Sequence, residues 1–307
     1  MFFPVHNTAV IVQLSAVRLD NNKLQNALRE KTTNRKAYAV PCFFRKKHWT
    51  LCKIDIALQL SSTPAEQIEN KMLVPFRESY YQSTRIFANI KYHVAMNIQS
   101  FQFNAFSENT HVIWNSEKQA VIIDPGMSNR IEESEFLSWL KSEELTVVDV
   151  WLTHCHIDHI MGLDFCFREF GLKGIAHELD KVNIERSEMV AGMYGIPYTA
   201  GPEPEYLLQE GKMNRQGFET DVLFVPGHSP GHVAFYFNEV GVVFSGDVLF
   251  ERSIGRTDLP GGDFDTLVTS IRTKMYTLPE ETVIYSGHGD TTTIGAEKRE
   301  NPFVKGE

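Results

Sequence analysis

The sequence lacks any long hydrophobic run. Its most apolar stretches, such as TAVIVQL and VVDVWL, are far shorter than the roughly 18–20 residues that a membrane-spanning helix needs. The N-terminal segment also lacks the cationic opening of a secretory signal, and His6, Asn7 and Gln13 interrupt its apolar character. We therefore expect neither a membrane span nor a membrane partner.

Cysteine is scarce, with only Cys42, Cys52, Cys155 and Cys166 in 307 residues. So few thiols do not make a dense disulfide framework, and Cys155 lies between two histidines that are candidate metal ligands. We expect reduced thiols, and together with the missing signal this favours the cytoplasm.

The charge is distributed unevenly along the chain, whose net charge is −9. Residues 1–95 hold 14 Lys and Arg against 6 Asp and Glu, whereas residues 96–307 hold 16 against 33. A basic segment can be a nucleic-acid-binding arm or a solvated extension. This one has no repeat, no interleaved aromatics and only short basic clusters, so we interpret it as an extension. The acidic remainder would repel phosphate backbones, and no nucleic-acid partner is expected.

Met96 separates two regions of different character. Residues 1–95 show weak hydrophobic periodicity, and two interpretations remain open: a genuine accessory region, or upstream sequence translated ahead of a true start at Met96. Residues 96–307 alternate strand-like and helix-like patterns, with hairpin-like pairs, and are expected to form the working domain. Mixed elements of this kind favour an α+β fold with helices on the outer faces of sheets. The sequence does not indicate the oligomeric state.

Polar residues cluster where four predicted strands end. THCHIDH, at 153–159, follows VVDVWL; GHSPGH, at 227–232, follows VLFVP; GD, at 246–247, follows VVFS; and GHGD, at 287–290, follows TVIYS. Glycine lets a backbone turn sharply and approach closely, and loops on a rigid scaffold commonly carry functional residues. The repetition predicts that the four segments share one site.

The HxHxDH pattern is typical of a metal site. His154 and His156 are two residues apart, so both rings face one side of an extended segment. Asp158 and His159 can face a second ion, and Asp247 can provide a carboxylate shared by both. The sequence therefore predicts His154, His156 and His228 on one ion, Asp158, His159 and His288 on the other, and Asp247 between them.

Histidine and aspartate bind several divalent metals. We expect zinc, while iron and manganese remain open. The second histidine of GHSPGH, His232, is expected to pack behind the ligands. His111 and His177 have no partner motif and are assigned no role, and neither are the histidines before Met96.

These motifs, in this order and spacing, resemble the metallo-β-lactamase superfamily, and more closely its small glyoxalase-II-like hydrolases. The tail segments SGDVLFERSIGRTDLPGGD and SGHGDTTTIGAEKRENPFV are similar to those of the compact bacterial members. The resemblance extends from about Met96 to Phe303. It implies a four-layer αββα sandwich with the site at one edge, between the two sheets.

Two bound metals would lower the pKa of water from about 15.7 to about 7, so a carbonyl could be attacked without a protein nucleophile. Asp158 could orient the water or accept its proton while also serving as a ligand, or it could be a ligand only. The resemblance implies a small-molecule thioester substrate, S-2-hydroxyacylglutathione and in practice S-lactoylglutathione. A thiol pKa of about 8.5 makes the thiolate a tolerable leaving group.

The chain departs from the larger glyoxalase II enzymes in two respects. It stops about twenty residues after SGHGD, without their C-terminal helical domain, and it carries Arg256 and Asp258 where they carry a lysine and a tyrosine. Arg256 could bind a substrate carboxylate, or Asp258 could hold it in an ion pair. GRTD at 255–258 also resembles the persulfide dioxygenases, which use one iron. That activity and a metal-dependent esterase or lactonase are the alternatives.

Overall fold

The computed structural model describes residues 38–41, 51–54 and 96–306. The chain divides into two compact units, residues 1–93 and 94–307. In the first, β1 (Tyr38–Pro41) pairs antiparallel with β2 (Leu51–Ile54). The expectations for His6, Cys42 and the other residues before Met96 that lie outside β1 and β2 fall outside the described residues, and the status of residues 1–95 stays a prediction.

The first sheet of the second unit is built from one continuous stretch of chain. Its strands run in the order β3-β4-β5-β6-β7-β8, with β3 to β5 antiparallel and β5 to β8 parallel. The strands are β3 (Asn97–Phe103), β4 (Glu108–Trp114), β5 (Gln119–Ile123), β6 (Thr146–Trp151), β7 (Ile175–His177) and β8 (Glu205–Leu208).

The second sheet follows entirely after the first in the sequence. Its order is β16-β15-β12-β11-β10-β9, and only the β12–β15 pair is parallel. The strands are β9 (Gly211–Arg215), β10 (Phe218–Phe224), β11 (Val233–Phe237), β12 (Val242–Gly246), β15 (Val283–Ser286) and β16 (Thr292–Thr293). A small hairpin, β13 (Leu249–Phe250) and β14 (Ser253–Ile254), lies between β12 and β15 in the sequence.

Side chains that alternate along the strands build separate cores on the two faces of each sheet. In β5, Val121 and Ile123 belong to the core that contains Phe235 and Phe244 of the second sheet. Ala120 and Ile122, which alternate with them in β5, face the other way and pack with the helices. Because both faces of the sheet are covered, the central strands read as nearly continuous apolar runs.

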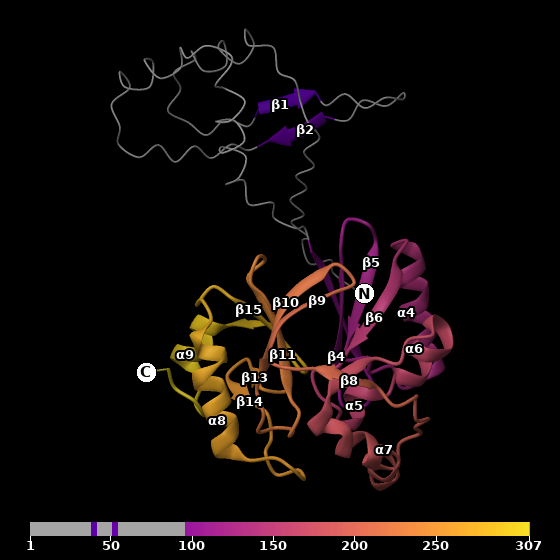
Figure 1. Ribbon diagram of the computed structural model, residues 1–307, viewed down its shortest axis with the longest axis vertical. Coiled ribbons are helices and arrows are strands. Elements are labelled where there is room, and N and C mark those ends of the chain that lie inside the picture. The colour runs from indigo at the N-terminus through magenta and orange to yellow at the C-terminus, as the bar shows by residue number, and fades with distance from the viewer. Residues whose placement is uncertain (1–37, 42–50, 55–95, 307) are drawn as a thin grey trace. The chain divides into compact units, whose positions relative to one another are not determined.

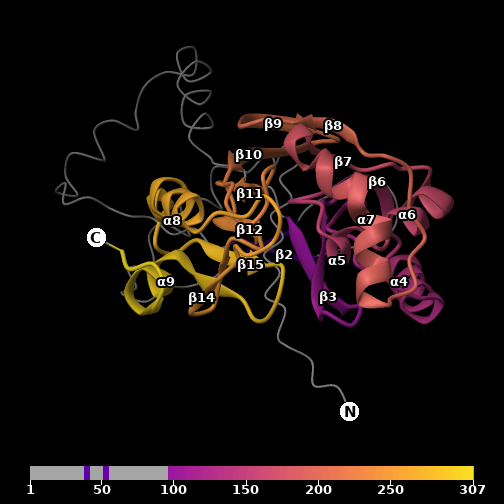
Figure 2. The same cartoon turned by 90° about the horizontal axis from the view of Figure 1, so that it is seen from below.

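Helices cover the outer face of each sheet, so Figure 2 shows four layers, helix, sheet, sheet and helix. Phe136 and Leu140 of α4 pack into the core of the first sheet, and Leu267 and Ile271 of α8 into that of the second. The helices are α4 (Arg130–Ser142), α5 (Ile157–Ile160), α6 (Leu163–Phe170), α7 (Lys181–Tyr194), α8 (Phe264–Thr273) and α9 (Ile294–Glu300), labelled in Figure 1. The predicted α+β fold and its αββα sandwich are confirmed.

Helix ends follow the local sequence. The Asn129 side chain accepts hydrogen bonds from two backbone N–H groups at the start of α4, and the Asp263 side chain accepts one from a backbone N–H group at the start of α8.

Among the described residues, no helix combines the length and apolarity that crossing a bilayer requires.

Candidate metal centre

Seven predicted side chains meet at one edge of the two sheets. His154, His156, Asp158 and His159 follow β6 of the first sheet, in the loop that leads into α5 and in its first turn. The others follow strands of the second sheet: His228 after β10, Asp247 after β12 and His288 after β15. The strand ends therefore bring both halves of the domain to the same place.

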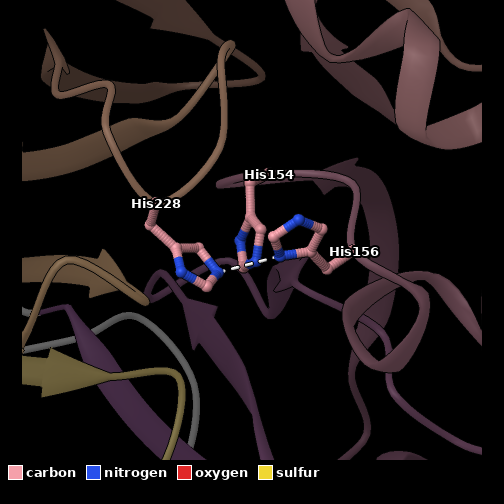
Figure 3. Close-up of side chains that lie close together, drawn as sticks. All are labelled: His154, His156 and His228. Carbon is pink, nitrogen blue, oxygen red and sulfur yellow. Dashed lines mark hydrogen bonds between the residues drawn. The ribbon is translucent and has the colours of Figure 1, made fainter. Parts of the chain in front are cut away.

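The first predicted group is assembled as expected. His154, His156 and His228 each offer a ring nitrogen, and these nitrogens all lie within 4.8 Å of one another. His156 Nδ1 and His228 Nε2 are 2.8 Å apart, and Figure 3 shows the three rings converging from two different loops. His154 and His228 are buried. Such a set of imidazole nitrogens can hold one divalent cation.

The second predicted group lies beside it. Asp158, His159 and His288 also offer one ligand atom each within 4.8 Å. Asp158 Oδ2 is 3.2 Å from His288 Nε2 and 3.7 Å from His159 Nε2. His159 is fully buried, whereas Asp158 and His288 retain some exposure, so this side of the centre is the more open.

Asp247 lies between the two groups. Its Oδ2 is 3.5 Å from His228 Nε2, in the first group, and 3.5 Å from His288 Nε2, in the second. Its Oδ1 is 3.4 Å from His159 Nε2, a charge contact rather than a well-formed hydrogen bond. One carboxylate thus faces ligands of both groups, which is the position expected of a bridging anion.

Hydrogen bonds behind the rings select the nitrogen that faces the centre. His228 donates from Nδ1 to the Arg256 carbonyl at 2.8 Å, and His288 from Nδ1 to the Phe106 carbonyl at 3.1 Å. A histidine that donates from Nδ1 keeps the lone pair of Nε2 for a metal. The local structure therefore turns Nε2 of both rings toward the centre.

Three buried polar atoms at the centre have no hydrogen-bond partner within the described part of the chain: His154 Nε2, His159 Nε2 and Asp247 Oδ1. Burying a polar atom without a partner is unfavourable. Together these atoms make up a nitrogen and oxygen donor set that a divalent cation would satisfy. The residues present therefore fit the metals that the motif predicts.

In the metal-free centre, His156 and Asp247 are already in the form that binds a metal. Burial and the neighbouring His228 lower the pKa of His156 to about 3, so its ring is neutral at pH 7. Burial opposes ionisation of Asp247, but His159 and its other imidazole neighbours hold the pKa of that carboxyl well below its usual range. Neutral imidazole and ionised carboxylate are the forms that bind a metal. Burial opposes protonation of His288, yet Asp158 and Asp247 raise its pKa to about 10, so this ring carries a proton in the metal-free centre and releases it when it binds a metal.

Asp124, at the end of β5, was not predicted. It accepts hydrogen bonds from the Thr153 N–H at 2.7 Å, the Thr153 hydroxyl at 2.6 Å and His159 Nδ1 at 3.1 Å. The same hydroxyl is 3.1 Å from His154 Nδ1. Asp124 also forms a third group of potential ligands with His154 and His159, but its oxygens are already occupied as acceptors. It orients the ligand loop from behind.

Asp180 was also missed. It is fully buried and accepts hydrogen bonds from the Cys155 N–H at 2.6 Å, the Gly231 N–H at 2.7 Å and the Ser229 hydroxyl. Cys155 lies between the ligands of the first motif, and Ser229 follows His228. One carboxylate therefore joins the two loops that supply the first group. Nothing in the sequence around Asp180 marks it as functional.

The second histidine of GHSPGH, His232, lies where packing was expected. Its ring stacks on His154, with centroids 4.5 Å apart, and its Nε2 accepts a hydrogen bond from the Asp247 N–H at 3.1 Å. His111 lies between the sheets and contacts the Ser286 carbonyl through Nε2, and His177 stacks on Phe224. Cys155 and Cys166 are free and buried.

A cavity of about 650 Å³ opens beside the centre. Its walls include the exposed sides of the ligands, one face of α7 and the segment around Arg256. Arg256 is therefore positioned to reach a substrate, but its guanidinium forms a two-pronged ion pair with Asp258, both contacts at 2.7 Å. Both sequence-based interpretations of Arg256 thus have support, and its role in substrate binding stays a prediction.

Comparison with known proteins agrees with this architecture. Residues 104–288 match the family model of the metallo-beta-lactamase superfamily. A curated relative from Haemophilus influenzae, "Hydroxyacylglutathione hydrolase GloC", is 40% identical over 212 residues, which cover 68% of this chain and 98% of the relative.

Solved structures lead to the same family. The BLEG-1 B3 metallo-beta-lactamase is 39% identical, with a TM-score of 0.63, over 68% of this chain and 99% of that one. TTHA1623, solved in a di-iron-bound form, is 37% identical, with a TM-score of 0.61, over 67% of this chain and all of that one. The chain therefore belongs to the metallo-beta-lactamase superfamily.

Proposed function

We propose that this protein is a dinuclear metal-dependent hydrolase of thioesters, with S-2-hydroxyacylglutathione, in practice S-lactoylglutathione, as its substrate. The observation that carries the proposal is the position of Asp247, whose Oδ2 lies 3.5 Å from a histidine of each ligand group. The similarity to the hydroxyacylglutathione hydrolase of Haemophilus influenzae supports the choice of substrate.

His154, His156 and His228 would hold one ion and Asp158, His159 and His288 the other, with Asp247 shared. When bound, such a pair of ions lowers the pKa of water and polarises a carbonyl. We take zinc as the metal, while the di-iron form of TTHA1623 keeps iron as an alternative.

Asp158 is the proposed proton acceptor. Burial opposes its ionisation, but His159 and His288 lower the pKa of its carboxyl, so it is charged at neutral pH. It lines the cavity, and its Oδ2 is held 3.2 Å from His288 Nε2. An ionised carboxylate in this position can orient a water molecule and take its proton at Oδ2.

The lining of the cavity favours a thioester over substrates with poorer leaving groups. Among the described residues, the only carboxyls that line it are Asp158 and Asp247, and the pKa of each is lowered. At neutral pH neither holds a proton before the reaction begins, so the lining offers no resident carboxylic acid for a departing group. A thiolate leaves without that help, since a thiol pKa of about 8.5 is close to neutral.

The test is turnover of S-lactoylglutathione by protein of measured metal content, compared with Asp158→Ala. We expect the variant to lose activity by about 100-fold or more. Asp164→Ala, at a half-buried aspartate on α6 that pairs with Arg168, lies outside the cavity lining; it is the matched control and should retain activity. Equal turnover by Asp158→Ala would remove Asp158 from the mechanism.

Assays on the same protein of measured metal content distinguish the alternative functions. Oxygen consumption with a persulfide and one iron per chain would favour a persulfide dioxygenase, and hydrolysis of esters or lactones in preference to thioesters would favour an esterase. The cytoplasm remains the proposed compartment, supported by the free thiol of Cys155 between two candidate ligands.

A further inference from the structure

Helix α7 forms one wall of the cavity beside the candidate metal centre. It packs next to α5, which carries Asp158 and His159 (Figure 1). The cavity-lining residues of α7 are spaced mostly three or four apart, as one face of a helix requires. They are Asn183, Arg186, Ser187, Met189, Val190, Met193 and Tyr194.

Arg186 is a positively charged residue of this wall without an ion-pair partner among the described residues. Across the described residues, its guanidinium has no hydrogen bond or ion pair, whereas Arg256 is paired with Asp258 through two contacts of 2.7 Å. The two carboxylates that line the cavity, Asp158 and Asp247, are engaged with histidines of the centre. A guanidinium at such a wall is free to bind a carboxylate in a bidentate manner.

Toward its outer end the wall is apolar and open to the solvent. Met189, Met193 and Tyr194 are 57%, 78% and 51% exposed, although large apolar side chains are commonly buried. The Tyr194 ring packs edge to face against the Phe106 ring, with centroids 5.4 Å apart. The backbone carbonyl of Phe106 accepts the hydrogen bond from His288 Nδ1. The wall therefore offers an apolar surface with one cationic group, which suits an extended ligand that carries a carboxylate.

We propose that Arg186 binds a carboxylate on the thiol carrier of the substrate, while Met189 and Met193 contact the body of the carrier. This inference rests on the proposed thioesterase function. A hydroxyacyl group of a few carbon atoms occupies a small part of the cavity of about 650 Å³, and its carbonyl must reach the metal centre. The wall away from the centre is therefore left to the carrier. The structure thus assigns anion recognition to Arg186 instead of the predicted Arg256.

A ligand that cannot be hydrolysed tests the proposal by binding alone. S-methylglutathione, a thioether, keeps both carboxylates of the carrier and has no carbonyl at sulfur. We expect Arg186→Gln in the metal-loaded protein to weaken its binding, measured by titration calorimetry, by about tenfold or more, the effect of one lost charge-assisted contact. Arg186→Lys should recover part of the affinity. Arg272→Gln on α8 removes an equal charge outside the cavity and should bind as the wild type does.

The dimethyl ester of the same thioether, which lacks both carboxylates, identifies the partner of Arg186. It should bind the wild type more weakly than the acid does, and Arg186→Gln should cause no further loss. Weakening by Arg256→Gln but not by Arg186→Gln would overturn the assignment, as would a wild type that does not bind the thioether. If the wild type binds the thioether but does not hydrolyse S-lactoylglutathione, the proposed function is wrong, whereas the role of Arg186 in binding a carboxylate is still supported.

Discussion

The carboxylate of Asp180 accepts a hydrogen bond of 2.6 Å from the backbone N–H of Cys155, between two ligands of the first group. Its other oxygen accepts from the Gly231 N–H at 2.7 Å, so a single buried side chain sets the distance between two loops that are far apart in the sequence. The first ligand group therefore depends on a residue that does not touch it.

Asp180→Asn should loosen this connection, because an amide nitrogen would face backbone donors. Loss of hydrogen bonds to a buried charge is expected to lower the free energy of unfolding by roughly 3 kcal/mol. Metal should also be lost more readily during dialysis against a chelator. Thermal unfolding and metal analysis measure the two effects. Asp221→Asn on β10, whose side chain has no hydrogen bond or ion pair among the described residues, is the control.

Gly287→Ala should damage the centre without unfolding the protein. A Cβ at this position would lie 2.2 Å from Asp247 Oδ1 and 2.7 Å from His159 Cε1. A displacement of about 1 Å at the reacting groups commonly costs about 100-fold in rate, and we expect a loss of that size. Circular dichroism should be unchanged. Gly192→Ala, on α7 with no atom within 4 Å of the new Cβ, should retain activity; equal losses in both variants would contradict the prediction.

Metal removal should destabilise the fold. The metal-free centre buries three polar atoms without hydrogen-bond partners in the described part of the chain, and a tightly bound cation stabilises the state that binds it. We expect chelation to lower Tm by about 10 °C in differential scanning calorimetry and stoichiometric zinc to restore it. An unchanged Tm would show that the centre carries no bound metal.

His111 should make the metal-free protein sensitive to acid. Burial lowers its pKa to about 4, whereas the unfolded chain binds this proton near pH 6.5. The unfolded state therefore binds more protons between these values, so stability falls as the pH is lowered from 6.5 to about 4, by up to roughly 3 kcal/mol for this residue. Urea unfolding at several pH values should give a shallower dependence for His111→Gln. An identical slope would mean that His111 does not contribute.

A chain that starts at Met96 should keep the activity of the full chain, within about twofold, because the unit that begins at Val94 holds the whole candidate centre. Steady-state turnover and solubility of both proteins test this. Loss of either would show that residues 1–95 support the domain.

The convergence of the candidate ligands was predictable because each is marked by its neighbours. A strand-like run that ends in glycine, histidine or aspartate indicates a loop at a sheet edge, and two histidines two residues apart share a side. Asp124 and Asp180 could not be found in this way. They act on backbone N–H groups of loops elsewhere in the chain, a relationship that leaves no local pattern.

Part of the fold is hard to predict for a different reason. Strand β8 follows GPEP, and prolines with a glycine are typical of a connection and not of a strand. Strand β9, GKMNR, is polar and lies at the edge of its sheet, so it lacks the apolar alternation on which the prediction depended. Arg256 and Asp258 were correctly seen as able to pair, but the sequence did not single out Arg186.

Each sheet is a continuous stretch of chain, and the boundary falls between Leu208 and Gly211. Four of the seven candidate ligands lie before this boundary and three after it. Cutting the backbone there would yield two polypeptides, neither with a complete centre. A metal ion bound by ligands from both polypeptides would favour their reassembly. The domain is therefore a natural starting point for a split reporter of divalent cations.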